Sequence, residues 1–279
     1  MFGRFSKRYA ESKALAFTPE TVVKTIDPTH APVEAEVTRL AQAVGVKTGL
    51  FRVPRVLAHD ADTGSITFER LHGLVTLGQF LAGDRDGHEL LARAGEAIAA
   101  VHAHMCLPAP LKFAAPASLQ SDPSDEVAIH GDFNTLNSCY IPDADELVLL
   151  DWSTAPALSE KITTGSRYID LAQFVRSLLI HQAGHIRACK LFSNRSRAFL
   201  AGYQRRAGLS VDMDALTRFL LKISFHHMKH QFSWPGSMGK LSQAANCLAG
   251  HVALAAFGAK WLGNPIDPNS CLKETRKWA

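Results

Sequence analysis

The spacing of apolar residues over the first seventy positions predicts a small β-sheet with one helix. The run TVVKTI, residues 21–26, is rich in β-branched residues. Its period of two places Val22, Lys24 and Ile26 on one face of a strand. Two further strands are predicted at 53–58 and 65–71, because a turn-rich DADTG segment separates two apolar runs.

A helix is predicted to begin at Pro32, because proline is well tolerated in the first helical turn. Its apolar residues recur at helical spacing and form one stripe. The stripe consists of Val33, Val37, Leu40 and Val44. Glu34, Glu36 and Arg39 lie off this stripe.

Beyond Gly73 the pattern changes to long amphipathic helices. The clearest helix covers 88–104, and others are predicted from Tyr168 onward, near 187–206, 212–231 and 240–261. Residues 127–152 interrupt them, with VAIH and ELVLLD as two short strands that flank a loop and PDAD as the turn between them. We therefore predict a small lobe over residues 1–72, a larger helical lobe over 73–279, and a hinge at 69–73.

Composition narrows the possible ligands. The 279 residues carry 30 basic and 26 acidic side chains and contain only short basic clusters, so we expect no nucleic-acid binding, whereas an anionic ligand such as a nucleotide suits the charge balance. The five cysteines are far apart and form no CxxC pair, so we expect neither a disulfide framework nor a cysteine-rich zinc site. No run of about 18 uncharged apolar residues occurs, so we expect no membrane span and a cytoplasmic protein.

The segment from residue 130 to residue 152 carries the groups that phosphoryl transfer needs. Asp132 follows a short apolar strand, Asn137 lies five positions later, and Asp151 ends the next strand. Magnesium prefers oxygen ligands and keeps several waters, so Asn137 and Asp151 suffice once nucleotide oxygens join them. Asp132 is then available to orient a substrate hydroxyl and accept its proton.

The sequence HGDFNTLN followed by LLDW resembles the catalytic and metal-binding loops of the aminoglycoside phosphotransferase and choline kinase superfamily. The resemblance implies an α+β, two-lobed protein-kinase-like fold that uses ATP and Mg²⁺. It assigns the catalytic aspartate to Asp132 and the metal ligands to Asn137 and Asp151. Gly131 and Trp152, which stand where protein kinases carry Arg and the Phe of DFG, favour the small-molecule branch.

The resemblance extends upstream to the nucleotide. Lys24 matches the lysine that pairs the α- and β-phosphates, and Glu36 matches the glutamate that holds this lysine, with Glu34 as the alternative. The segment ITFERLHG resembles the hinge that hydrogen-bonds adenine. The implied nucleotide contacts are Val22, Lys24, Glu36, Glu69, Arg70 and Leu71.

Two further residues near the loops are expected to be structural. The resemblance implies that His130 braces the catalytic loop and that Asp170, in SRYIDLAQF, caps a helix or braces a loop. One departure from the family is that no glycine-rich motif precedes Lys24. The segment 4–13 could cover the phosphates instead, or the hairpin is truncated.

The histidines of FHHMKH raise a metal-binding alternative, since His226 and His230 are four residues apart. No glutamate lies within the spacing, as a zinc protease motif requires, so we do not expect a metal there. Together with His227 and Trp234, these side chains could instead line the acceptor pocket.

The sequence therefore predicts an ATP- and Mg²⁺-dependent enzyme that moves the γ-phosphate to a hydroxyl of a small molecule such as a sugar, an amino alcohol or an aminoglycoside-like compound. One alternative is a kinase-like nucleotide-binding module with weak or no catalysis, which the missing glycine loop favours and the intact Asp132, Asn137 and Asp151 oppose. Another is a kinase for a protein or a lipid-linked glycan. The acceptor, the preference for ATP or GTP, and the oligomeric state stay open.

Overall fold

The computed structural model describes residues 14–82, 87–120, 125–152, 158, 161–180 and 187–232, with the side chains of 14, 180, 187–191 and 230–232 left aside. Four features discussed above lie outside these residues. They are the segment 4–13, the side chain of His230, Trp234 and the helix predicted near 240–261.

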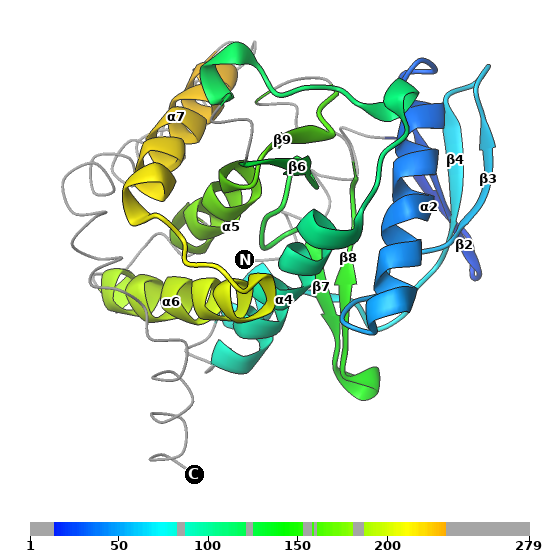
Figure 1. Ribbon diagram of the computed structural model, residues 1–279. Coiled ribbons are helices and arrows are strands. Elements are labelled where there is room, and N and C mark those ends of the chain that lie inside the picture. The colour runs from blue at the N-terminus through cyan, green and yellow to red at the C-terminus, as the bar shows by residue number, and fades with distance from the viewer. Residues whose placement is uncertain are drawn as a thin grey trace.

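An antiparallel sheet of four strands forms the first part of the chain, with strand order β1-β2-β4-β3. The strands are β1 (Ala14–Phe17), β2 (Thr21–Thr25), β3 (Val56–Asp60) and β4 (Ser65–Glu69). Helix α2 (Ala31–Thr48) lies beside this sheet, toward the rest of the molecule (Figure 1). The strand predicted at 53–58 begins later, at Val56, and the preceding Arg52 forms a parallel bridge with Val148, outside the first sheet.

Helix α2 differs from its prediction in which residues it buries. Val37 and Val44 are buried as the stripe predicts, but Glu34 is also buried, with 1% of its surface exposed. Glu34 shares a face with the small residues Ala31 and Ala41, which are three and seven positions away and are fully buried. Glu34 therefore lies on a buried face of the helix although it is off the predicted apolar stripe.

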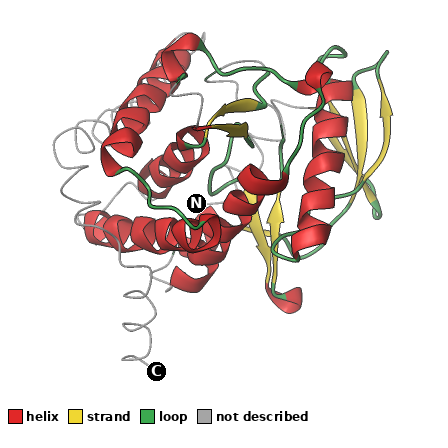
Figure 2. Ribbon diagram, viewed as in Figure 1, coloured by secondary structure: helices red, strands yellow, loops and turns green. Residues whose placement is uncertain are grey.

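The remainder of the chain is mainly helical (Figure 2). Its helices are α3 (Leu77–Leu81), α4 (His88–His104), α5 (Tyr168–Ile180), α6 (Arg187–Ala207) and α7 (Met213–Phe232). Helices α4 and α6 pack so closely that a Cβ on Gly95 would lie 2.1 Å from the carbonyl oxygen of Phe199, and one on Gly202 would lie 2.0 Å from that of Ala92. Glycine is needed at both contacts because the two backbones leave no room for a side chain.

Two pairs of short strands lie between α4 and α5. Strand β7 (Ser138–Ile141) pairs with β8 (Glu146–Leu149) through a turn at 142–145, and β5 (Val75–Thr76) adds to β7. Strand β6 (Glu126–Ala128) pairs with β9 (Thr164–Ser166). VAIH and ELVLLD thus each contribute a strand as predicted, but PDAD joins β8 to β7, which was not predicted. In the part of the chain that the structure describes, no helix is both long and apolar enough to cross a membrane.

Candidate active site

One polar face of α5 holds in place the HGD loop, the segment 130–137 that begins with His130, Gly131 and Asp132. The buried carboxylate of Asp170 accepts the backbone N–H of His130 at 2.8 Å and that of Gly131 at 3.0 Å. Gln173, one turn further along, donates from its side chain to the carbonyl of Gly131. Ser177, another turn along, accepts the N–H of Thr135 at 3.0 Å. Because residues 170, 173 and 177 share a helix face, a single helix fixes the loop. Asp170 was expected either to cap a helix or to brace a loop, and these contacts correspond to the second function.

Asp170 is itself held by two residues that the sequence did not indicate. His102, from α4, lies 3.0 Å from a carboxylate oxygen of Asp170, and its other ring nitrogen lies 3.0 Å from the hydroxyl of Tyr203, from α6. Burial raises the pKa of Tyr203 to about 12, so its hydroxyl keeps its proton at neutral pH. No local sequence pattern marks these residues; the packing of α4 on α6 brings His102 to Tyr203, and the position of α5 brings Asp170 to His102.

Gly131 has a structural reason to be glycine. Its φ is +88°, and a Cβ there would lie 3.0 Å from the carbonyl oxygen of Ile162 and 2.9 Å from that side chain. Both the positive φ and the close contact disfavour any other residue.

Asp132 and Asn137 are in direct contact. The side-chain NH₂ of Asn137 donates to the backbone oxygen and to the carboxylate of Asp132, both at 2.9 Å. Asn134 supports the same turn by accepting the N–H groups of Leu136 and Asn137 at 2.8 and 3.1 Å. Because Asp132 takes the amide hydrogens, the side-chain oxygen of Asn137 is the end that remains for a cation.

Asp151 follows β8 with a backbone φ of +63°, which is uncommon for a non-glycine residue and occurs often at functional sites. The N–H of its neighbour Leu150 donates to the carbonyl of Asn137 at 2.9 Å, which places the two candidate metal ligands beside each other. The ring of Trp152 lies 4.4 Å from that of His130, and both residues are buried. Burial lowers the pKa of His130, so the imidazole is neutral.

Lys24, on β2, contacts two carboxylates. Its ammonium pairs with Glu34 and, at 2.6 Å, with Asp151. Burial alone would lower the pKa of Lys24, but the charges of Asp151 and Glu34 outweigh it and raise the pKa, so Lys24 stays charged. This contact joins the first sheet to the metal-ligand segment.

The partner predicted for Lys24 was wrong in one respect. Glu36 is paired with Arg39 at 3.2 Å on the helix surface, and Glu34, the alternative, contacts Lys24. Residue 36 is two positions, about 200° around the helix, from residue 34, so the two side chains cannot face the same strand.

The hinge segment after β4 offers a backbone donor. The N–H of Glu69 donates to Arg55 and that of Arg70 donates to Glu20, both at 2.9 Å. Among the described residues no acceptor contacts the N–H of Leu71. The carboxylate of Glu69 is bound by Arg55 at 2.9 Å, so a nucleotide contact through that side chain is not supported. Val22 is half-buried on β2, opposite Phe68 of β4.

These residues fit a magnesium nucleotide by their chemistry. Asn137 and Asp151 supply the oxygen donors that a hard cation prefers, and Lys24 supplies a positive charge in contact with one of them. The site therefore brings together a base candidate, two metal-ligand candidates and a lysine, through contacts from Lys24 to Asp151, from Leu150 to Asn137, and from Asn137 to Asp132.

The two histidines of α7 whose side chains the structure describes have different partners. His226 lies 2.9 Å from the hydroxyl of Ser118, whereas His227 lies 3.4 Å from the side-chain oxygen of Gln173. Of these two, it is His227 that contacts a residue bonded to the HGD loop, because Gln173 donates to Gly131.

The architecture is a two-lobed α+β fold of the protein-kinase-like type, as the loop motifs implied. No protein-family model and no curated protein matches the sequence. Solved structures do match: a glucosamine kinase in complex with glucosamine, ADP and inorganic phosphate is 14% identical over 90% of this chain and 81% of its own, with a TM-score of 0.59. A choline/ethanolamine kinase family protein from Mesorhizobium loti is 15% identical over 87% and 83% (TM-score 0.55), and the choline kinase LicA from Streptococcus pneumoniae is 13% identical over 91% and 99% (TM-score 0.54).

Proposed function

We propose that this protein is an ATP- and Mg²⁺-dependent phosphotransferase that moves the γ-phosphate to a hydroxyl of a small molecule. The observation that carries the proposal is the contact chain Lys24–Asp151, Leu150–Asn137, Asn137–Asp132. Phosphoryl transfer is catalysed mainly by positioning and charge neutralisation, and these contacts bring together a side chain for each of the two tasks.

Each residue has one task in the proposal. Asn137 and Asp151 hold the magnesium ion, which when bound neutralises charge on the phosphates. Lys24, kept charged by two carboxylates, binds phosphate oxygens, and the backbone N–H of Leu71 donates a hydrogen bond to the adenine ring of ATP. Asp132, oriented by the amide of Asn137, holds the acceptor hydroxyl and accepts its proton.

The acceptor class rests on the resemblance and on the folds found to be similar, which include a glucosamine kinase and choline kinases. We propose a sugar, an amino alcohol or an aminoglycoside-like compound, and a cytoplasmic enzyme that draws on cellular ATP. His227, which touches Gln173 behind the HGD loop, is the described histidine best placed to influence acceptor binding.

The decisive experiment combines binding with turnover. Millimolar MgATP should raise the melting temperature of the wild type, and a panel of hydroxylated metabolites should contain one that stimulates ADP release. Asp132→Asn should abolish that release and leave the MgATP shift nearly intact. Asp143→Asn is the matched control, because Asp143 is exposed in the turn that follows β7, and both measurements should stay at wild-type values.

The outcomes separate the alternatives. If MgATP produces no shift, the nucleotide site is refuted. If MgATP binds but no acceptor stimulates ADP release, the chain is a nucleotide-binding module. If Asp132→Asn retains turnover, the catalytic assignment is wrong.

A further inference from the structure

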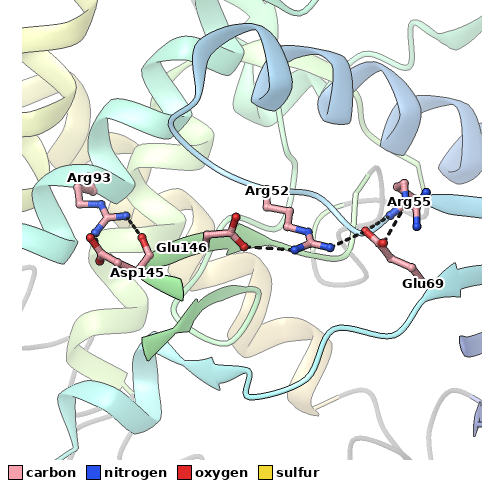
Figure 3. A network of polar contacts seen from close by, with 6 residues as sticks. All are labelled: Arg52, Arg55, Glu69, Arg93, Asp145 and Glu146. Atoms are coloured by element: carbon pink, nitrogen blue, oxygen red, sulfur yellow. Dashed lines mark hydrogen bonds and ion pairs between the residues drawn. The ribbon is translucent and has the colours of Figure 1, made fainter. Parts of the chain in front are cut away.

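A cavity of about 390 Å³ lies behind the hinge. Its walls are the last turns of α2, the segment 49–53 that follows α2, the end of β4, and the turn between β7 and β8. None of the catalytic or metal-ligand candidates lines it. Six charged side chains do, three arginines and three acidic residues (Figure 3): Arg52, Arg55, Glu69, Arg93, Asp145 and Glu146.

Arg52 is the centre of this network. One nitrogen of its guanidinium lies 3.3 Å from Glu69, and another lies 3.3 Å from Glu146 (Figure 3). Its backbone is fixed as well, because its N–H donates to Leu147 at 2.8 Å and its carbonyl accepts from Leu149 at 2.9 Å. The side chain therefore extends from a backbone anchored on β8 and bridges two separate elements.

The two elements that Arg52 joins are the ones that a magnesium nucleotide must contact together. Glu69 is the last residue of β4 and begins the hinge. Glu146 begins β8, in the hairpin that starts directly after Asn137 and ends two residues before Asp151. Glu69 is firmly held: burial alone would raise its pKa, but hydrogen bonds from Arg55 and the charge of Arg52 outweigh this and lower the pKa.

A second pair in the same cavity holds the hairpin without reaching the hinge. Arg93, on α4, lies 2.6 Å from both the carboxylate and the backbone oxygen of Asp145. Figure 3 shows this pair apart from the Arg52 network. Arg93 therefore supplies a matched arginine whose loss affects the hairpin tip and leaves Glu69 untouched.

We propose that Arg52 is a positioning residue for nucleotide binding, which fixes the hinge relative to the hairpin that the two metal-ligand candidates flank. The proposal rests on the proposed function, because it assumes a nucleotide at the hinge and a metal at Asn137 and Asp151. In this proposal Arg52 contacts neither the nucleotide nor the metal ion. It acts through its side-chain contacts with Glu69 and Glu146.

The geometry predicts that losing Arg52 weakens nucleotide binding when Mg²⁺ is present and has little effect when it is absent. A ligand that contacts the hinge and the metal ligands at once needs both in register, whereas metal-free ADP does not use Asn137 and Asp151 as metal ligands. A positioning contact can improve affinity only by the free energy with which it favours the competent arrangement. Since Arg52 is 40% exposed, the loss should be about three- to fivefold in affinity.

The test is isothermal titration of purified full-length variants with ADP, once with Mg²⁺ and once with EDTA. Arg52→Gln should raise the dissociation constant for MgADP about three- to fivefold and change that for metal-free ADP by less than about twofold. Arg93→Gln should leave both within about twofold of wild type. Glu146→Gln removes only the side-chain contact between Arg52 and the hairpin and leaves the backbone pairing of Arg52 with Leu147 and Leu149 in place. It should therefore weaken MgADP binding in the same Mg²⁺-dependent way as Arg52→Gln but less strongly, and should add little to it in the double variant.

The outcomes are distinguishable. Equal loss with and without Mg²⁺, no loss at all, or the same loss in Arg93→Gln would each overturn the positioning role. A wild type that binds no MgADP would refute the proposed function instead. Glu146 is 42% exposed, so Glu146→Gln should fold and decides the question if Arg52→Gln does not.

Discussion

Replacing Glu34 tests which acidic residue of α2 holds the lysine. Glu34 and Lys24 expose only 2% and 5% of their side chains, and Lys24 also pairs with Asp151 at 2.6 Å. Removing one partner of a buried ion pair typically costs about 3–5 kcal/mol. Glu34→Gln keeps an amide oxygen for Lys24 and leaves Asp151 in place, so we expect a loss of about 2 kcal/mol in the free energy of unfolding.

The same change should weaken nucleotide binding. In Glu34→Gln the carboxylate of Asp151 becomes the main charged partner of Lys24 in the described structure, and that contact competes with a metal ion for the same carboxylate. A shift of about 1.4 kcal/mol toward this arrangement corresponds to a tenfold weaker affinity. Urea unfolding and MgADP titration at several Mg²⁺ concentrations measure the two effects, and higher Mg²⁺ should recover part of the lost affinity.

Glu36→Gln is the matched control. Glu36 is 46% exposed and pairs with Arg39, three residues away, at 3.2 Å, so its loss should cost less than about 0.5 kcal/mol and leave MgADP affinity unchanged. The reasoning is refuted if the two variants behave alike, or if Glu36→Gln is the more damaging one.

Two further predictions concern the HGD loop. Asp170→Asn replaces a buried acceptor of two backbone N–H groups. It should lower the free energy of unfolding, measured with urea, by about 3 kcal/mol, because hydrogen bonds to a charged group contribute about 1.5–3 kcal/mol each. A decrease below about 1 kcal/mol would contradict the bracing role. Burial lowers the pKa of His130 below its ordinary 6.5, so the unfolded chain binds the proton more readily and stability is lost as the pH falls below about 6.5. His130→Phe removes this loss, so its stability deficit relative to wild type should shrink between about pH 8 and pH 5; a constant deficit would show that His130 does not titrate differently on unfolding.

The sequence located the elements of the site well but not all of their partners. The helices at 88–104, 187–206 and 212–231 were predicted within a residue or two of the structure, because long amphipathic repeats give a strong signal. Strand β7 was missed, since its four residues, SCYI, give too short a pattern. The side chains of Gln173 and Ser177 were missed as well, although residues 170, 173 and 177 already share one helix face.

The sequence by itself determined which chemical groups are available. The spacing of Asp132, Asn137 and Asp151 is local to one loop and one hairpin, so a motif of about twenty residues specifies it. The resemblance to a kinase superfamily followed from that motif, and the fold agrees with it.

Only the tertiary structure decided which distant residues serve those groups. Lys24 and Asp151 are 127 positions apart, and His102 and Asp170 are 68 apart, so nothing in their local sequences links them. Whether Glu34 or Glu36 faces Lys24 depends on how α2 is rotated against the sheet, and both are acidic residues in the same helix. That rotation is fixed by the packing of Ala31, Ala35 and Ile66, a contact between elements that no local pattern contains.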